Sequence, residues 1–183
     1  TTYLEDSWRL LAIDLYDRGG SDPWPGHRAQ SLDDDAALVI ALADEVCPAH
    51  LVGHSYGGAV AVQAALAAEP SFTSLVLLEP QLYPLLMEGG EADLLADKQA
   101  LSEGFLDPID EGRKAEGWQF FVDHFNGAGT WQGLSDAKRQ EFIAMSASAR
   151  RKYDAMYGCP TRRADLGGIS LPTFVLWGGE TAA

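Results

Sequence analysis

Short apolar runs alternate with longer helix-forming stretches along the first half of the chain. The apolar runs cover residues 8–15, 49–53 and 73–78, and each is followed by a polar or glycine-rich turn. Between them lie residues 31–46, with apolar positions at helical spacing, and the alanine-rich stretch 59–68. Strands and helices that alternate in this way predict right-handed crossovers and a mostly parallel sheet, so the predicted fold class is α/β.

The pattern changes after residue 80, and the next β-forming run is at residues 172–177. The intervening segment is rich in helix formers and aromatic residues. Three helices are predicted there, at about residues 91–103, 110–126 and 135–157. We interpret residues 81–165 as a helical cap subdomain inserted into a core made by residues 1–80 and 166–183.

The clearest chemical signal is the stretch AHLVGHSYGG at residues 49–58. Its centre, GHSYG, matches the pattern G-x-S-x-G, with an apolar run before it and a helix-forming run after it. A serine between a strand and a helix stands at a strained turn, where its hydroxyl is exposed. We therefore expect a nucleophile elbow with Ser55 as the nucleophile.

The neighbours of this serine have predicted roles of their own. We expect only very small side chains to fit at Gly53 and Gly57, which flank the turn, and Gly58 adds a third glycine. The predicted helix begins directly after the serine, so the backbone N–H of Tyr56 is a candidate donor to an oxyanion. The side chain of His54 is expected to diverge from the serine and to pack beneath the elbow.

Composition narrows the choice of function. The 183 residues are 46% hydrophobic, and the formal charge of −14 argues against binding to nucleic acid or to an anionic membrane. The two cysteines have neither metal-ligand spacing nor the pattern of a disulfide framework, so we expect a cytoplasmic protein. We recognise no signal peptide and no membrane span, and the expected partner is a small-molecule substrate. The sequence implies no metal and no cofactor, and it leaves the oligomeric state open.

Three segments together resemble the α/β-hydrolase family: DLYDRGGSD at residues 14–22, LVGHSYGG at 51–58 and LPTFVLWGGE at 171–180. The resemblance implies a partial α/β-hydrolase core with a helical cap, and serine esterase activity. The family's His-Gly oxyanion loop and its catalytic histidine have no counterpart in this sequence. We therefore expect a piece of a longer enzyme, without its base and its second oxyanion donor.

The acid that would orient a histidine has two candidates. The family usually places it after the strand at residues 172–177, where Glu180 follows, whereas some relatives place it one strand earlier, where Glu79 stands. We favour Glu79, although a carboxylate at this position could also cap the next helix. Asp14 is expected to anchor its own loop. We do not expect a triad base among the four histidines, which are His27, His50, His54 and His124.

Aromatic residues of the predicted cap are candidates for an apolar substrate pocket. Trp118, Phe121 and Phe125 could line it, together with His124. Phe121 and Phe125 are one helical turn apart, so they could equally form the core of the cap. A satisfied or exposed histidine is the alternative for His124.

The predicted function is a serine hydrolase that acts on a small, largely apolar ester or related carbonyl substrate through an acyl-enzyme on Ser55. Two alternatives stay open. One is a carbon–carbon bond hydrolase of the same fold. The other is a catalytically inert binding module or fragment that lacks the triad histidine.

Overall fold

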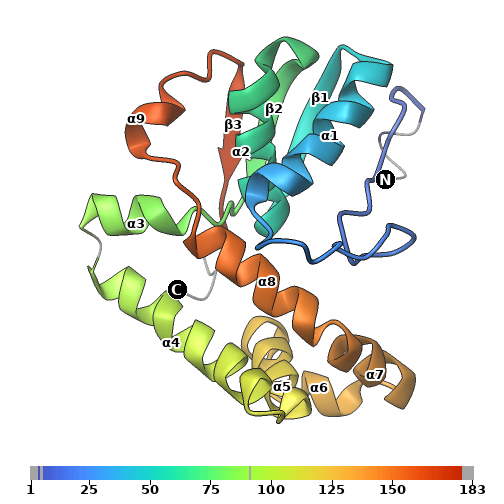
Figure 1. The fold of residues 1–183 in the computed structure, drawn as a ribbon, viewed down its shortest axis with the longest axis vertical. Helices are drawn as coiled ribbons and strands as arrows, with labels where there is room; N and C mark the ends of the chain where they lie inside the picture. The colour runs from blue at the N-terminus through green and yellow to red at the C-terminus, as the bar shows by residue number, and fades with distance from the viewer. Residues whose placement is uncertain (1–3, 5, 91, 179–183) are drawn as a thin grey trace.

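The computed structural model confirms the α/β fold with a parallel sheet (Figure 1). It describes residues 4, 6–90 and 92–178. Three strands form the sheet in the order β1 (Ala49–His54), β2 (Phe72–Leu78) and β3 (Thr173–Leu176). His54 pairs with Leu78, and Leu78 pairs with Leu176, so the carboxyl ends of all three strands lie at the same edge. Ligands of such sheets bind at this edge.

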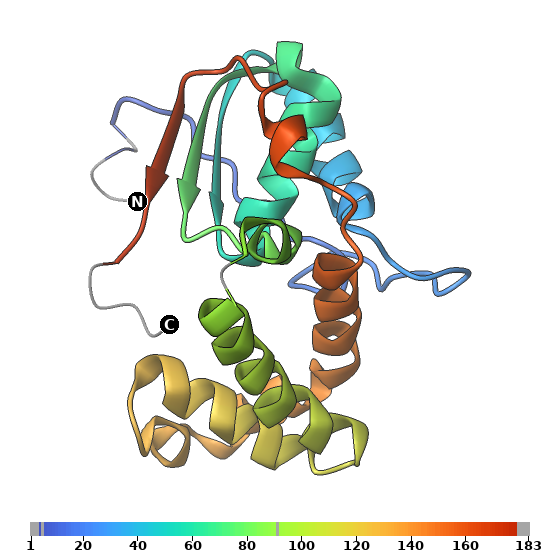
Figure 2. The same cartoon turned by 90° about the vertical axis from the view of Figure 1, so that its left-hand side faces the viewer.

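Two core helices, α1 (Leu32–Val46) and α2 (Tyr56–Ala68), lie on the same face of the sheet (Figure 2). A short 3₁₀ turn, Glu69–Ser71, leads from α2 into β2. Leu75 and Leu77 of β2 are buried against the small side chains of α2, whereas Val52 on the other face of β1 is 62% exposed. The helices that the structure describes therefore cover one face of the sheet only.

Residues 8–15 were predicted as a strand, and they form none in the structure. Trp8 packs edge-on against His50 of β1, with ring centroids 4.9 Å apart, but Leu10 and Leu11 are exposed. A strand requires a neighbouring chain edge for its ladder hydrogen bonds. No described strand pairs with this segment, so the apolar run does not become part of the sheet.

The segment after β2 is helical up to residue 166, and most of it forms a layer beyond the carboxyl edge of the sheet (Figures 1 and 2). Its helices are α3 (Tyr83–Gly89), α4 (Ala92–Asp110), α5 (Lys114–Asn126), α6 (Thr130–Gly133), α7 (Asp136–Ala144), α8 (Ser146–Tyr157) and α9 (Arg163–Leu166). The predicted helix 135–157 is divided at Met145, which separates α7 from α8. Helix α8 runs back from this layer to the core.

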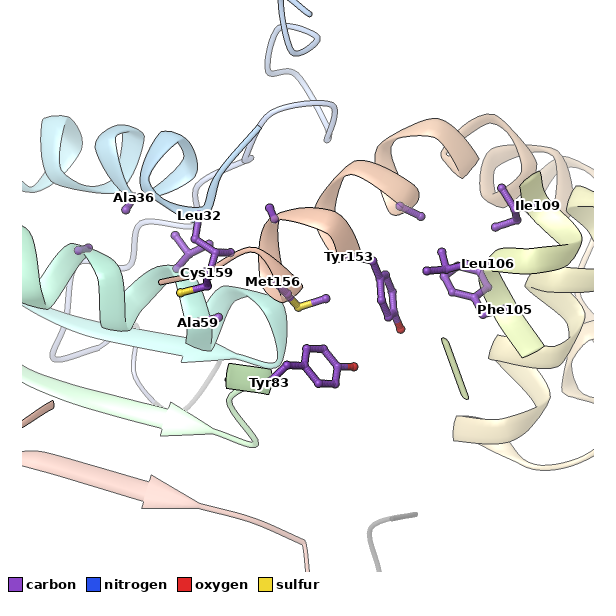
Figure 3. Close-up of a cluster of buried hydrophobic side chains, with 14 of the residues drawn as sticks. Leu32, Ala36, Ala59, Tyr83, Phe105, Leu106, Ile109, Tyr153, Met156 and Cys159 are labelled. Carbon is purple, nitrogen blue, oxygen red and sulfur yellow. The ribbon is translucent and has the colours of Figure 1, made fainter. Parts of the chain in front are cut away.

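One cluster of buried side chains connects the core with the helical layer (Figure 3). It extends from Leu32 of α1 and Ala59 of α2, past Met156 of α8, to Phe105 of α4. Phe105 is 1% exposed. Its ring lies 4.8 Å from Trp118, 4.7 Å from Phe121 and 5.7 Å from Tyr153, measured between centroids. Packing around this ring fixes α4, α5 and α8 relative to one another.

Candidate active site

Ser55 stands at the turn between β1 and α2, in a conformation that L-residues rarely adopt, with φ 53° and ψ −121°. Such a backbone costs about 1–3 kcal/mol and persists only where its surroundings impose it. Here the Ser55 N–H donates to the Leu78 carbonyl at 2.9 Å. The Ser55 carbonyl accepts hydrogen bonds from the N–H groups of Gly58 at 2.9 Å and Gln81 at 3.2 Å. The turn is thereby tied to both ends of the loop that follows β2.

Two of the three elbow glycines are required by close backbone contacts. A Cβ atom on Gly53 would lie 2.4 Å from the Gly57 carbonyl oxygen, and one on Gly58 would lie 2.9 Å from Pro80. A Cβ atom on Gly57 would meet no described atom within 4 Å. The expectation of a steric need at Gly57 was therefore wrong. Position 53 excludes a larger residue because the backbone of Gly57 lies against it. Position 57 itself has room for a side chain.

Tyr56 is the first residue of α2, so its backbone N–H has no acceptor within the helix. The helix dipole adds a partial positive charge at this end. The phenol of Tyr56 points to α1, where its hydroxyl donates to Oδ2 of Asp35 at 2.6 Å. Burial, followed by the contact with Asp35, raises the pKa of the Tyr56 hydroxyl far above its usual range. The phenol therefore stays protonated and holds the first turn of α2 against α1.

Glu79 follows the last residue of β2, one strand over from the nucleophile, and it lines the same cavity as Ser55. Its backbone also has a positive φ, 46°, and its N–H donates to the Leu176 carbonyl at 2.8 Å. The carboxylate oxygen Oε1 accepts the N–H of Gly178 at 2.8 Å. The other candidate acid, Glu180, lies outside the described residues.

The histidines differ in their surroundings. His54 is exposed and lines the cavity, which corrects the expectation that it packs beneath the elbow. Nδ1 of His50 lies 2.7 Å from the Ser74 hydroxyl, and His27 lies beside Trp24. Within residues 4, 6–90 and 92–178, no histidine makes a hydrogen bond with Ser55.

A cavity of about 1320 Å³ lies between the carboxyl edge of the sheet and the cap helices. Ser55 and Glu79 are on its core wall, and Trp118, Phe121 and Phe125 line its cap wall. His124 lies outside this cavity, which corrects its placement there. Its ring stacks on Phe120, 6.0 Å away between centroids, at a separate small depression on the cap. Trp118 and Phe121 also contact Phe105, so these two residues belong to the cap core as well as to the cavity wall.

The sequence matches the model of the Alpha/beta hydrolase family over residues 2–183. The chain belongs to this family. The match covers the elbow, the strand that carries Glu79 and the cap, and it confirms the resemblance seen in the sequence. In the part of this α/β hydrolase that the structure describes, no helix has the length and apolar character needed to cross a membrane. The same residues contain no His, Cys, Asp and Glu cluster that could hold a metal ion.

Two curated relatives and one solved structure illustrate the similarity. Lipase LipV of Mycobacterium tuberculosis is 33% identical over 117 residues, which are 62% of this chain and 42% of the lipase. The dihydrolipoyllysine-residue acetyltransferase component of the acetoin cleaving system of Pseudomonas putida is 28% identical over 183 residues, or 95% of this chain and 45% of that protein. The chain thus spans less than half of either relative. A mutant of the meta-cleavage product hydrolase CumD superposes with a TM-score of 0.62 at 19% identity, over 97% of this chain and 64% of that one.

Sequence reasoning missed a buried polar network beside the elbow of this α/β hydrolase. Asp35 of α1 is fully buried, and besides Tyr56 it accepts hydrogen bonds from Nε2 of Gln30 at 3.1 Å and from the Tyr16 N–H at 3.3 Å. Nζ of Lys152 on α8 lies 3.7 Å from Oδ2 of Asp35. Burial lowers the pKa of Lys152, and the charge of Asp35 partly offsets this effect. In the sequence, Asp35 resembles any acidic residue in the first turn of a helix, so nothing distinguished it from Asp33.

The loop at residues 14–22 is fixed by contacts of its own. The Asp14 carboxylate accepts the Gly20 N–H at 2.9 Å, which agrees with its expected role as an anchor. The Asp17 carboxylate accepts the Trp24 N–H at 3.2 Å and forms an ion pair with Arg151 of α8 at 2.9 Å. These contacts place the loop beside α8 at one end of the cavity.

Proposed function

We propose that this α/β hydrolase is a serine hydrolase that cleaves a small, largely apolar ester or related carbonyl substrate through an acyl-enzyme on Ser55. The observation that carries the proposal is the strained Ser55 turn at the wall of a cavity lined mainly by apolar side chains. Strain of this kind is kept at sites where it presents a reacting group. Similarity to a lipase over 62% of the chain supports the choice of an ester.

In this proposal Oγ of Ser55 forms a bond with the carbonyl carbon of the substrate, and its proton passes to an imidazole base. The carbonyl π electrons move onto oxygen, where the Tyr56 N–H stabilises the negative charge. The intermediate then expels the alcohol, which takes the proton from the imidazolium. Water releases the acid by the same steps in a second half-reaction.

Glu79 is proposed to orient that imidazole, as the acid does in a Ser-His-acid triad. Its position at the end of the strand next to the nucleophile supports this role. The proposal requires a histidine that the described residues do not supply, because none of theirs contacts Ser55 by a hydrogen bond.

Carbon–carbon bond hydrolysis is the second candidate reaction. This reaction could use a serine on the same elbow. The fold similarity to a meta-cleavage product hydrolase supports it as a second candidate. Activity on unsaturated diketones, without activity on 4-nitrophenyl esters, would support this reaction over ester cleavage.

The test is labelling with a fluorophosphonate, read by intact mass, in the 183-residue chain and in the protein as its source organism makes it. We expect a single adduct in the latter, and none in its Ser55→Ala variant. Absence of an adduct from folded protein would contradict the proposal. A catalytically inert binding module would then be the remaining hypothesis. An adduct on the 183-residue chain alone would show that a base within this chain activates Ser55.

The role of Glu79 needs its own pair of variants. Glu79→Gln should slow labelling by a factor of about 10²–10⁴ because an unoriented imidazole is a poor base. Glu103→Gln changes an exposed carboxylate of α4 and should leave the rate unchanged. Equal labelling rates in both variants would remove Glu79 from the mechanism.

A further inference from the structure

One cation at the cavity of this hydrolase has no carboxylate partner among the described residues. Arg18, on the loop at residues 14–22, lines the cavity together with Ser55. The hydrogen bond of its guanidinium is donated by Nη1 to the thioether sulfur of Met145. A thioether is a weak acceptor, and a guanidinium offers five donors, so the described residues use only a small part of this group's bonding capacity.

The neighbouring carboxylates are already paired. Asp17 forms its ion pair with Arg151, and Asp35 lies against Lys152 and accepts three further hydrogen bonds. These two carboxylates therefore pair with Arg151 and Lys152, and Arg18 has no carboxylate of its own among the described residues. Burial lowers the pKa of Arg18, and the charges of Asp17 and Asp35 only partly offset this effect. A guanidinium nevertheless stays charged.

The other ionisable groups on the cavity wall form no ion pair with Arg18 among the described residues. The Asp14 carboxylate accepts an N–H of its own loop, and the Glu79 carboxylate accepts the Gly178 N–H just after β3. Lys98 of α4 is a further cation on the wall. Around these groups the wall is mainly apolar, with residues such as Leu82, Leu86 and Phe105. An unpaired charge against such a wall is costly unless a ligand pairs with it.

We propose that the cavity binds a substrate with a carboxylate, which pairs with Arg18 while the scissile carbonyl lies at Ser55. The inference rests on the proposed function, and it narrows the substrate class to carboxylic acids that also carry an ester or a related carbonyl group. A carboxylate matches the fork of a guanidinium and can accept two parallel hydrogen bonds. Its single negative charge matches the one guanidinium of the cavity that has no carboxylate partner among the described residues.

The pairing predicts selectivity against neutral analogues. A site that has already desolvated a cation gains little from a neutral group of the same shape, because the cation then stays unpaired. Displacing the Met145 sulfur from Arg18 costs little by comparison. An acid should therefore bind more tightly than its amide, although the two differ little in size.

Equilibrium binding tests the inference without requiring turnover. The probes are three oxo acids of increasing length, 4-oxopentanoate, 5-oxohexanoate and 7-oxooctanoate, and the primary amide of each. They are titrated calorimetrically at low salt into the parent protein, Arg18→Gln, Arg18→Lys and the control Arg113→Gln. Arg113 lies between α4 and α5, away from the cavity, and pairs with Glu111 and Glu116.

In the parent protein and in Arg113→Gln, at least one acid should bind about tenfold or more tightly than its amide. In Arg18→Gln that ratio should fall to about one, and Arg18→Lys should keep part of it. Equal binding of acids and amides by the parent protein, or no binding of either at millimolar concentration, overturns the inference without any variant. Selectivity that survives Arg18→Gln but is lost in Lys98→Gln overturns the assignment to Arg18.

The same experiment separates this inference from the proposed function. The oxo acids are ketones, so their binding depends neither on the base nor on the reactivity of Ser55. Failure of fluorophosphonate labelling together with acid selectivity would refute the serine hydrolase and keep the acid site. Labelling without acid selectivity would refute the acid site and keep the hydrolase.

Discussion

The core wall and the cap wall of the cavity are held in place in different ways. On the core wall, Ser55 and Glu79 both have positive φ angles and are fixed by main-chain hydrogen bonds to neighbouring strands. On the cap wall, Trp118 and Phe121 are fixed by packing around the ring of Phe105. The core wall therefore depends on backbone geometry, and the cap wall depends on side-chain volume.

This difference separates two tasks. A backbone fixed by strand pairing can hold a strained nucleophile, because every displacement breaks ladder hydrogen bonds. Packed side chains define a space that changes with each substitution, which suits the selection of a substrate. The loop at residues 14–22 and α8 connect the two walls through Asp17 and Arg151. Substitutions in the core wall, in the cap wall and in the loop that connects them should therefore differ in the type and size of their effect on stability.

The largest effect is expected at the centre of the cap. Phe105→Ala should lower the free energy of unfolding by about 3–5 kcal/mol, because it empties the site around which three helices pack. Urea denaturation followed by circular dichroism measures this loss. Phe125→Ala is the control, since that ring is 40% exposed and its loss should cost less than about 1 kcal/mol. A smaller loss in Phe105→Ala than in Phe125→Ala would show that packing around Phe105 does not stabilise the cap.

The second-largest effect is expected from the hydrogen bond between Tyr56 and Asp35, next to the elbow. Tyr56→Phe removes a hydrogen bond to the buried carboxylate of Asp35 and should cost about 1.5–3 kcal/mol of stability. The backbone N–H of residue 56 is unchanged, so labelling of Ser55 should persist in folded protein. Tyr157→Phe, at a partly exposed phenol, should change stability by about 0.5 kcal/mol or less. Loss of labelling in Tyr56→Phe at full stability would contradict a purely structural role for the phenol.

The elbow glycines give a comparison in which the sign of the effect changes. Gly53→Ala should cost about 1–3 kcal/mol, because its Cβ atom would meet the Gly57 carbonyl at 2.4 Å. Gly57→Ala should be neutral or should stabilise α2 by up to about 1 kcal/mol, since alanine favours a helix and the space is open. Thermal unfolding of both variants tests this order. Equal destabilisation would mean that the open space at Gly57 is filled in the protein.

The sequence predicted the core wall well because that wall depends on local patterns. The G-x-S-x-G match located the Ser55 turn, and the order of apolar runs placed Glu79 one strand away. The apolar run at residues 8–15 has the same local pattern and yet forms no strand, because pairing depends on a neighbour that a local pattern does not show.

The cap wall and the charged contacts of Arg18, Asp35 and Lys152 were harder to predict. No sequence pattern singled out Phe105, although it lies at the centre of the cap. His124 stands between two phenylalanines in the sequence but faces away from the cavity, because its face of α5 is set by packing against other helices. Arg18 and Asp35 meet Lys152 only through tertiary contacts more than 100 residues apart in sequence. No periodicity or short motif encodes such a contact.

The smallest predicted effect concerns the ion pair that joins the two walls, and it depends on pH. Burial acts to raise the pKa of the Asp17 carboxyl, but the hydrogen bonds from Arg151 and from the Trp24 N–H outweigh it, so the pKa lies below the ordinary value of 3.8. Above pH 3.8 the carboxylate is charged in both the folded and the unfolded state, and its stabilisation is fully present. As the pH falls further, the unfolded chain binds the proton first, and this stabilisation is lost.

Asp17→Asn should therefore cost less than about 1 kcal/mol at neutral pH, and the difference from the parent protein should shrink as the pH falls towards about 3. Urea unfolding at several pH values measures that difference, with Asp97→Asn as a control at an exposed carboxylate of α4. A difference that stays constant with pH would assign the cost to packing of the loop rather than to charge. The two walls would then be joined by loop packing, with the ion pair to Arg151 contributing nothing measurable.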